Sequence, residues 1–190
     1  MAMIAIPLST ETSRLFREID VSGYRDSSDH ITLFYLGDRI SIKTVLKIIP
    51  ILYEVSSGIR PFEAQCSKIT SFPKGDDGYP IIAELKSDIL LEIRENIKTL
   101  LDKNKIKYDN TFPEYKPHIT VSRDKNKPPK IKLPEKAKLP ITQLALYGGD
   151  NANGRIFVSF PFSLGVEKQA SDRALMFSSL FLTHTCYQRG

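Results

Sequence analysis

Cysteine and long apolar runs are both scarce in this chain of 190 residues. Only Cys66 and Cys186 occur. Two cysteines are too few for a disulfide framework and lack metal-ligand spacing, so we expect a protein of the reducing cytoplasm. No stretch approaches the roughly 18 apolar residues that cross a membrane. The first residues, Met1–Arg14, lack a basic segment followed by a long apolar one, so we expect neither a membrane span nor a secretory signal.

Excess positive charge is modest, and no dense arginine-rich helix is apparent. The formal net charge is +5, which offers few phosphate contacts to a long duplex, so we expect duplex DNA and RNA to be excluded. A mildly basic chain suits a nucleotide or a short oligonucleotide, cyclic ones included, although many unrelated proteins share this charge. The length favours one domain with a continuous core.

Histidine is also rare, but two of the three histidines open the same tripeptide. These are His30-Ile31-Thr32 and His118-Ile119-Thr120, each in a β-favouring stretch. In a strand, residues i and i+2 point to the same face, so each motif projects an imidazole and a hydroxyl in one direction. Chance produces such a pair on the order of once in a hundred sequences of this composition. The pair is therefore the strongest functional signal in the chain.

Two imidazoles and two hydroxyls around one phosphate can break a phosphodiester bond without a metal. One neutral histidine accepts the proton of the attacking hydroxyl while a protonated partner donates one to the leaving oxygen. Threonine hydroxyls hydrogen-bond the nonbridging oxygens, where charge develops in the transition state. Which histidine is the acid and which the base is left open by the sequence. A lone strand histidine is usually structural, but two in identical frames favour catalysis.

The hydrophobic pattern predicts an α+β fold of antiparallel sheets with helices on the outer faces. A helix from Ser41 to Val55 should kink or end early at Pro50. The segment Arg123–Lys138 is expected to be an extended loop, and Tyr24–Asp29 a turn. The expected strands are Met3–Leu8, His30–Leu36, Phe62–Ile69, Tyr79–Leu85, His118–Ser122, Ile141–Tyr147 and Arg155–Phe162, and the other expected helices are Ser13–Ile19 and Asp88–Lys103.

The two motif blocks, HITLFYLG and KPHITVSR, resemble those of the 2H phosphoesterase superfamily, in its LigT-like or 2′-5′ RNA ligase-like branch. The resemblance covers Ile4 to Leu164. It implies two pseudosymmetric lobes around a central groove lined by both histidine–threonine pairs, with no cofactor. Family members act on 2′,3′-cyclic phosphates, 2′-5′ linkages or cyclic oligonucleotides. The compact HITLFYLG block also resembles a phage-encoded branch that destroys cyclic nucleotide signals and so evades the bacterial CBASS defence.

Several other residues are weaker candidates for contacts with a substrate. Phe34 shares the alternation of His30 and Thr32, so it is expected to stack a base at the groove, unless it is a plain core aromatic. A charged loop is usually only solvated, but the basic residues after the second motif are also suited to attract an anionic strand. The expected rim contacts are Phe72, Lys74, Tyr115 and Lys116, and the basic residues are Arg123, Lys125, Lys127, Lys130 and Lys132.

Two other readings of the histidines are disfavoured. A zinc site would need further ligands that the chain does not offer nearby. The histidine-triad nucleotide-binding proteins need clustered histidines, and His184 lies apart in the tail as a surface or packing residue.

These observations together predict a metal-independent phosphodiesterase with catalytic His30, Thr32, His118 and Thr120. Cyclic oligonucleotide messengers are the leading substrate. RNA 2′,3′-cyclic phosphodiesterase activity, or processing of 2′-5′ RNA ends, is the alternative within the enzyme class. A non-catalytic nucleotide-binding module is the alternative from another class. The domain is expected to span residues 1–165, followed by a tail at 166–190 of unknown role.

Overall fold

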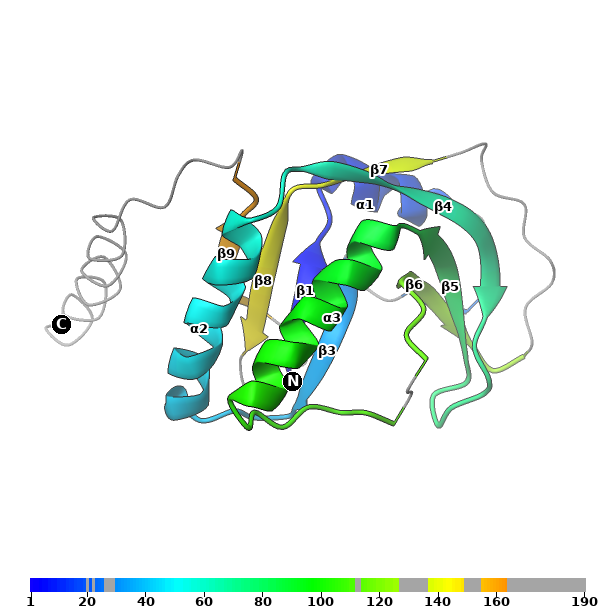
Figure 1. The fold of residues 1–190 in the computed structure, drawn as a ribbon. Coiled ribbons are helices and arrows are strands. Elements are labelled where there is room, and N and C mark those ends of the chain that lie inside the picture. Colours follow the sequence, from blue (N-terminus) through cyan, green and yellow to red (C-terminus); the bar gives the residue numbers. More distant parts are fainter. Residues whose placement is uncertain are drawn as a thin grey trace, which may run out of the picture.

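A computed structural model describes residues 1–19, 21, 23–25, 30–111, 114–126, 137–148 and 155–163. Within these ranges the chain forms helices and strands in mixed order (Figure 1). The helices are α1 (Thr10–Arg17), α2 (Ile42–Ser57) and α3 (Asp88–Lys103). The strands are β1 (Ala2–Pro7), β2 (Tyr24–Arg25), β3 (His30–Gly37), β4 (Phe62–Ser71), β5 (Tyr79–Lys86), β6 (His118–Asp124), β7 (Lys138–Ile141), β8 (Gln143–Gly148) and β9 (Arg155–Pro161).

The strands form two antiparallel sheets, one for each lobe. The first sheet has the order β3-β1-β8-β9 and the second has the order β2-β6-β5-β4-β7. Each sheet contains one of the two motif strands, β3 in the first and β6 in the second. The expected α+β fold with two lobes is therefore confirmed.

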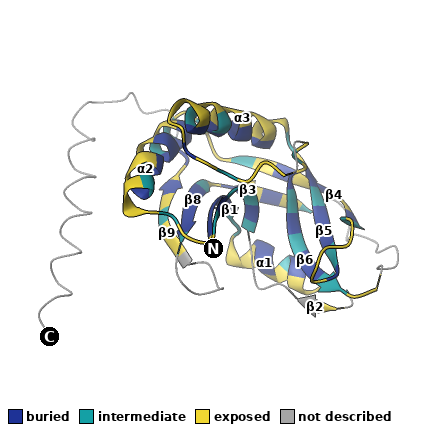
Figure 2. Cartoon of the chain, turned by 90° about the horizontal axis from the view of Figure 1, so that it is seen from below, coloured by how far each residue is buried: buried dark blue, intermediate teal, exposed yellow. Residues whose placement is uncertain are grey.

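Helices α2 and α3 lie side by side and cover the sheets with their apolar faces. Figure 2 shows that the faces of both helices toward the sheets are buried while their outer faces are exposed. The side chains of Ser41 and Ser87 cap α2 and α3 by accepting hydrogen bonds from main-chain N–H groups of the first turn. One continuous core of buried residues includes side chains from both sheets and from the helices.

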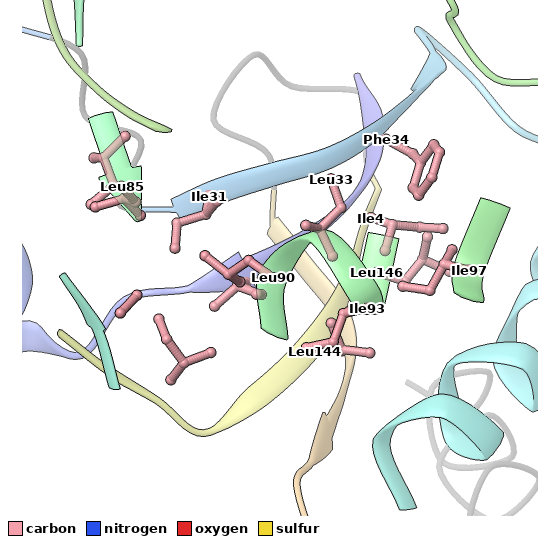
Figure 3. Close-up of a cluster of buried hydrophobic side chains, with 14 of the residues drawn as sticks. Ile4, Ile31, Leu33, Phe34, Leu85, Leu90, Ile93, Ile97, Leu144 and Leu146 are labelled. Carbon is pink, nitrogen blue, oxygen red and sulfur yellow. The ribbon is translucent and has the colours of Figure 1, made fainter. Parts of the chain in front are cut away.

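The apolar stripe on α3 carries much of this core. Leu90, Ile93 and Ile97 are almost fully buried, and Figure 3 shows them packed among residues of β1, β3 and β8. Burying an isoleucine or leucine side chain of this kind stabilises a fold by roughly 1.5–3 kcal/mol. The helix is thus a fixed support against which the first motif strand lies.

Three local expectations are wrong. The helix does not end early at Pro50, since α2 continues to Ser57, with the proline on its exposed face, where it removes only one hydrogen-bond donor. The expected strand Ile141–Tyr147 is two strands, since β7 pairs with β4 in the second sheet whereas β8 pairs with β1 in the first. Of the expected turn Tyr24–Asp29, the first two residues form strand β2, which pairs with the end of β6, and residues 26–29 lie outside the described ranges. In the part of the chain that the structure describes, no helix is long and apolar enough to cross a membrane.

Candidate active site

The two HxT motifs open strands that approach each other between the lobes. Cα atoms of β3 and β6 lie within 8 Å of one another, although the strands belong to different sheets. His30 lies opposite Pro7 of β1, and His118 lies opposite Glu84 of β5. The two strands that open with the paired motifs are therefore neighbours in space, although they belong to different sheets.

Both motif strands carry a β-bulge at the same motif position, directly after the threonine. In the first lobe Ala5 pairs with Thr32 and Ile4 pairs with Phe34, so Leu33 is the extra residue. In the second lobe Ile82 pairs with Thr120 and Ile81 pairs with Ser122, leaving Val121 as the extra residue. A bulge of this kind ends the simple alternation of side chains and redirects the strand. The two lobes thus repeat the same local geometry.

The first bulge reverses the expected direction of Phe34. After the extra residue, Phe34 points into the core with Ile4, and only 2% of it is exposed. Its ring lies at the edge of Tyr108, with ring centroids 5.1 Å apart. Figure 3 shows Phe34 on the core side of β3. The prediction that Phe34 shares the face of Thr32 and stacks a base is wrong, because a buried ring has no face left for a ligand.

Burial and one main-chain contact define the state of His118. Its Nδ1 donates a hydrogen bond to the carbonyl oxygen of Lys116 at 2.7 Å. A carbonyl only accepts, so Nδ1 carries a hydrogen and Nε2 of the neutral ring is the acceptor. Burial lowers the pKa of His118, and the bond to Lys116 partly offsets this. The Phe72 ring meets the imidazole edge-on, with centroids 4.7 Å apart. The lowered pKa favours the neutral form of the His118 ring, in which Nε2 carries the lone pair.

The first motif lies beside a small buried patch that sequence reasoning missed. The rings of His30 and Tyr147 are 5.4 Å apart and tilted by 43°. The hydroxyl of Thr32 points to the sulfur of Met3 at 3.8 Å. Met3, Ala5, Ala145 and Tyr147 form this patch on the face of β1 and β8 turned away from the main core. Along β1, Met3 and Ala5 alternate with the residues of the main core and so point to the opposite face. This alternation of apolar residues was the signal in the sequence for a second buried patch.

The predicted rim residues fall into different environments. Lys74 lies over the ring of Tyr79, with Nζ 5.9 Å from its centroid. The carbonyl of Lys116 orients His118, while its ammonium pairs with Glu114 at 3.6 Å. Arg123 is half-buried in β6 opposite Pro80. Lys125 is exposed just after β6.

Tyr115 supports the site from inside rather than lying at its rim. Its hydroxyl donates to the main-chain carbonyl of Thr32 at 3.0 Å, and burial raises its pKa. Other predicted positions lie outside the described residues, namely Lys127, Lys130, Lys132, His184 and the tail at 166–190.

Two further observations bear on the site. In the described ranges no group of three or more His, Cys, Asp or Glu side chains is placed to hold a metal ion. A cavity of 710 Å³ lies between the end of α2 and α3, lined by residues that include Glu54, Phe62 and Asn96. None of the four motif residues lines this cavity, so it is separate from the candidate site.

The bilobal fold with an HxT strand in each lobe defines a class, the 2H phosphoesterases. The model of the 2′-5′ RNA ligase superfamily matches residues 8–153, so the chain belongs to this superfamily. Membership assigns it to the making or breaking of phosphodiester bonds in general. No curated protein matches the chain.

Solved structures show the same fold at low sequence identity. The Thermus thermophilus protein TT0787 superimposes with a TM-score of 0.67 and 18% identity, covering 85% of this chain and 97% of that one. E. coli LigT complexed with NADP+ gives a TM-score of 0.58 and 17% identity, covering 85% and 94%. E. coli LigT complexed with 3′-AMP gives 0.57 and 16%, with the same coverage. These likenesses confirm the expected LigT-like fold.

Proposed function

We propose that the chain is a metal-independent phosphodiesterase that cleaves cyclic oligonucleotide second messengers with its two HxT motifs. The observation that carries this proposal is the matched placement of the motifs, which lie on neighbouring strands with a bulge at the same position. Binding alone would not require two acid/base groups in equivalent frames. Membership of the superfamily supports the same chemistry.

His118 is the general base and His30 the general acid in this proposal. Nε2 of His118 takes the proton of the attacking ribose hydroxyl as its oxygen bonds to phosphorus. The bond from phosphorus to the leaving oxygen breaks, and His30 protonates that oxygen. Thr32 and Thr120 donate hydrogen bonds to the nonbridging oxygens. The dependence of kcat on pH is then bell-shaped, and its two limbs belong to the coupled pair.

A nucleotide substrate is supported by charge and by the structural relatives. The chain is mildly basic, and LigT of the same fold has been solved with NADP+ and with 3′-AMP. Cyclic messengers come first because the HITLFYLG block resembles the phage anti-CBASS branch. We place the reaction in the cytoplasm on the basis of cysteine usage.

Processing of RNA ends is the second candidate. The description of the superfamily as 2′-5′ RNA ligases favours it. It predicts activity on 2′,3′-cyclic phosphate ends or 2′-5′ linkages. A binding module without catalysis is the third candidate and predicts no product at all.

One experiment separates these candidates. The protein is incubated in EDTA with cyclic dinucleotides, 2′-5′ oligonucleotides and RNA with 2′,3′-cyclic phosphate ends, and the product termini are identified. We expect cleavage of the cyclic dinucleotides that persists in EDTA and is absent from a His30→Ala/His118→Ala control.

Salt dependence provides a second criterion. Binding of many phosphates weakens by ~10³–10⁵ between 50 and 200 mM salt, whereas activity on a small cyclic substrate should fall only gently. A steep slope or a preference for RNA ends would favour the second candidate. Loss of activity in EDTA that a divalent ion restores would refute the metal-independent mechanism.

A further inference from the structure

Arg94 is a buried cation on the core side of α3. Only 6% of the residue is exposed. Its guanidinium carbon lies 4.9 Å from the centroid of Phe34 and 4.6 Å from the centroid of Tyr115. Its Nε is itself buried and makes no hydrogen bond to any described residue. The guanidinium is therefore held mainly between two aromatic rings.

A contribution to folding stability does not explain why an arginine is buried at this position. A buried cation loses its hydration and needs good partners in exchange. The partner carboxylate, Glu95, bonds Nη1 at 3.1 Å but is 66% exposed, and exposed ion pairs contribute little. Contacts with two rings stabilise the cation in part. An apolar side chain of similar length would fill the same space without the desolvation penalty.

Each of the two rings lies in the chain segment next to one of the two motifs. Phe34 follows Thr32 by two residues in β3, and Tyr115 precedes His118 by three residues on the approach to β6. Tyr115 also donates its hydroxyl hydrogen bond to the carbonyl of Thr32. Arg94 thus contacts both sides of the junction between the lobes, from a helix that packs along β3 (Figure 1).

A second contact shows that the chain between α3 and β6 follows the edge of β3. The N–H of Asp109 donates to the carbonyl of Tyr35 at 2.8 Å, and the ring of Tyr108 packs edge-on against Phe34. Residues 108 and 109 of this connection therefore lie along one motif strand, and the connection ends where the other motif strand begins. A contact that holds Tyr115 in place therefore also determines where β6 begins relative to β3.

We infer that Arg94 is a positioning residue whose guanidinium, held between Phe34 and Tyr115, sets the placement of the two HxT motifs relative to each other. This role rests on the proposed function, because it acts through His30 and His118. Arg94 itself touches no reacting atom in this role. Misplacing a catalytic group by about 1 Å can lower the rate by ~10²-fold, so a small shift at the junction is sufficient to affect turnover.

The test uses two variants and a matched control. Arg94→Met removes the charge and the planar contact but keeps an apolar side chain. Tyr115→Phe keeps the ring and deletes the bond to Thr32. The control, Glu95→Gln, weakens the exposed ion pair and leaves both ring contacts. For each we measure kcat and KM on the cleaved substrate, Tm, and the imidazole NMR signals of the three histidines.

We expect Arg94→Met to lower kcat by about tenfold or more, within the range for a misplaced group, with little change in KM. Its Tm should be unchanged or raised because a poorly compensated buried charge is gone. The His30 and His118 signals should move. Tyr115→Phe should shift the same signals and lower kcat in the same sense. The double variant should be no worse than the poorer single one, because both act through one junction.

Two results would overturn the inference. One is an unchanged kcat with unmoved His30 and His118 signals in both variants. The other is a fall in kcat that accompanies a lowered Tm while the signals stay in place, which would make Arg94 a packing residue. A wild-type protein that cleaves nothing in the substrate panel rejects the proposed function instead, and the imidazole signals still decide the role of Arg94.

Discussion

Tyr115 donates its phenolic hydrogen to the main-chain carbonyl of Thr32 at 3.0 Å, and the two residues are 83 positions apart in the chain. Thr32 lies in β3, the edge strand of the first sheet. The tyrosine therefore satisfies a carbonyl at that edge and attaches the segment leading to His118 to the strand that carries His30. The relative position of the motifs depends on this contact as well as on the two sheets.

The first prediction concerns the histidines as a pair. His30→Ala and His118→Ala each remove one proton-transfer group and should each lower kcat by at least ~10²-fold. If the two act as a unit, the double variant should be little worse than either single one. Steady-state kinetics on the cleaved substrate measure this. Losses that multiply in the double variant would show that the histidines act independently.

The hydrophobic pattern predicted most helices and strands, because such a pattern depends only on residues close together in the sequence. The alternation in β4 and the apolar stripe of α3 arise from burial of one face, and the apolar run of β1 from burial of both faces, which the order of residues encodes directly. The division of the expected strand Ile141–Tyr147 could not be seen this way. Whether β7 pairs with β4 or with β1 depends on a partner far away in the sequence, and both choices keep the residues extended.

The motif residues of the candidate site were predictable from the sequence, but the residues and bulges that hold them in place were not. His30, Thr32, His118 and Thr120 appear as a repeat in the sequence. The bulge after each threonine is a matter of register between two strands, and it removes Phe34 from the motif face. The burial of Arg94 between Phe34 and Tyr115 likewise has no local signal, since an arginine on a helix normally lies in solvent.

The threonines should matter less than the histidines. Thr32→Val and Thr120→Val keep the side-chain shape and remove the hydroxyl, so each should lower kcat by less than the ~10²-fold expected of a histidine variant. Water can partly replace a hydroxyl as a donor to the nonbridging oxygens. Thr→Ser variants at both positions serve as controls and should retain most of the activity. A valine variant as inactive as His118→Ala would contradict this ranking.

Cys66 should be chemically inert in the folded protein. It is 3% exposed, and burial raises the pKa of its thiol to about 11, so little reactive thiolate forms near neutral pH. In a Cys186→Ser variant, Ellman's reagent at pH 8 should not react until guanidinium unfolds the chain. Rapid reaction of the folded variant would show that β4 opens readily.

The tail should be dispensable for chemistry. Both motifs and all the described strands precede residue 164, and the last described residues are anchored, since Ser163 donates to the carbonyl of Ser57 at 3.0 Å. We propose that residues 1–165 are the domain, so a chain ending at Gly165 should fold and keep the kcat of the full chain. Circular dichroism and kinetics measure this. A folded but inactive truncation would place the tail in the mechanism.

The stability of the protein should fall at mildly acidic pH because of His118. Burial holds the pKa of His118 below its ordinary value of 6.5, so the unfolded chain binds this proton more readily than the folded one. The free energy of unfolding then decreases as pH falls from above 6.5 toward the folded pKa, and the loss is complete below that pKa.

His118→Gln removes this proton-binding difference and provides the test. Denaturant unfolding of the wild type and the variant is followed from pH 7.5 to pH 4.5. The variant should gain stability relative to the wild type as the pH decreases, because groups common to both proteins cancel in the difference. Two parallel stability curves would show that His118 has the same pKa in the folded and the unfolded chain, which would contradict a pKa lowered by burial.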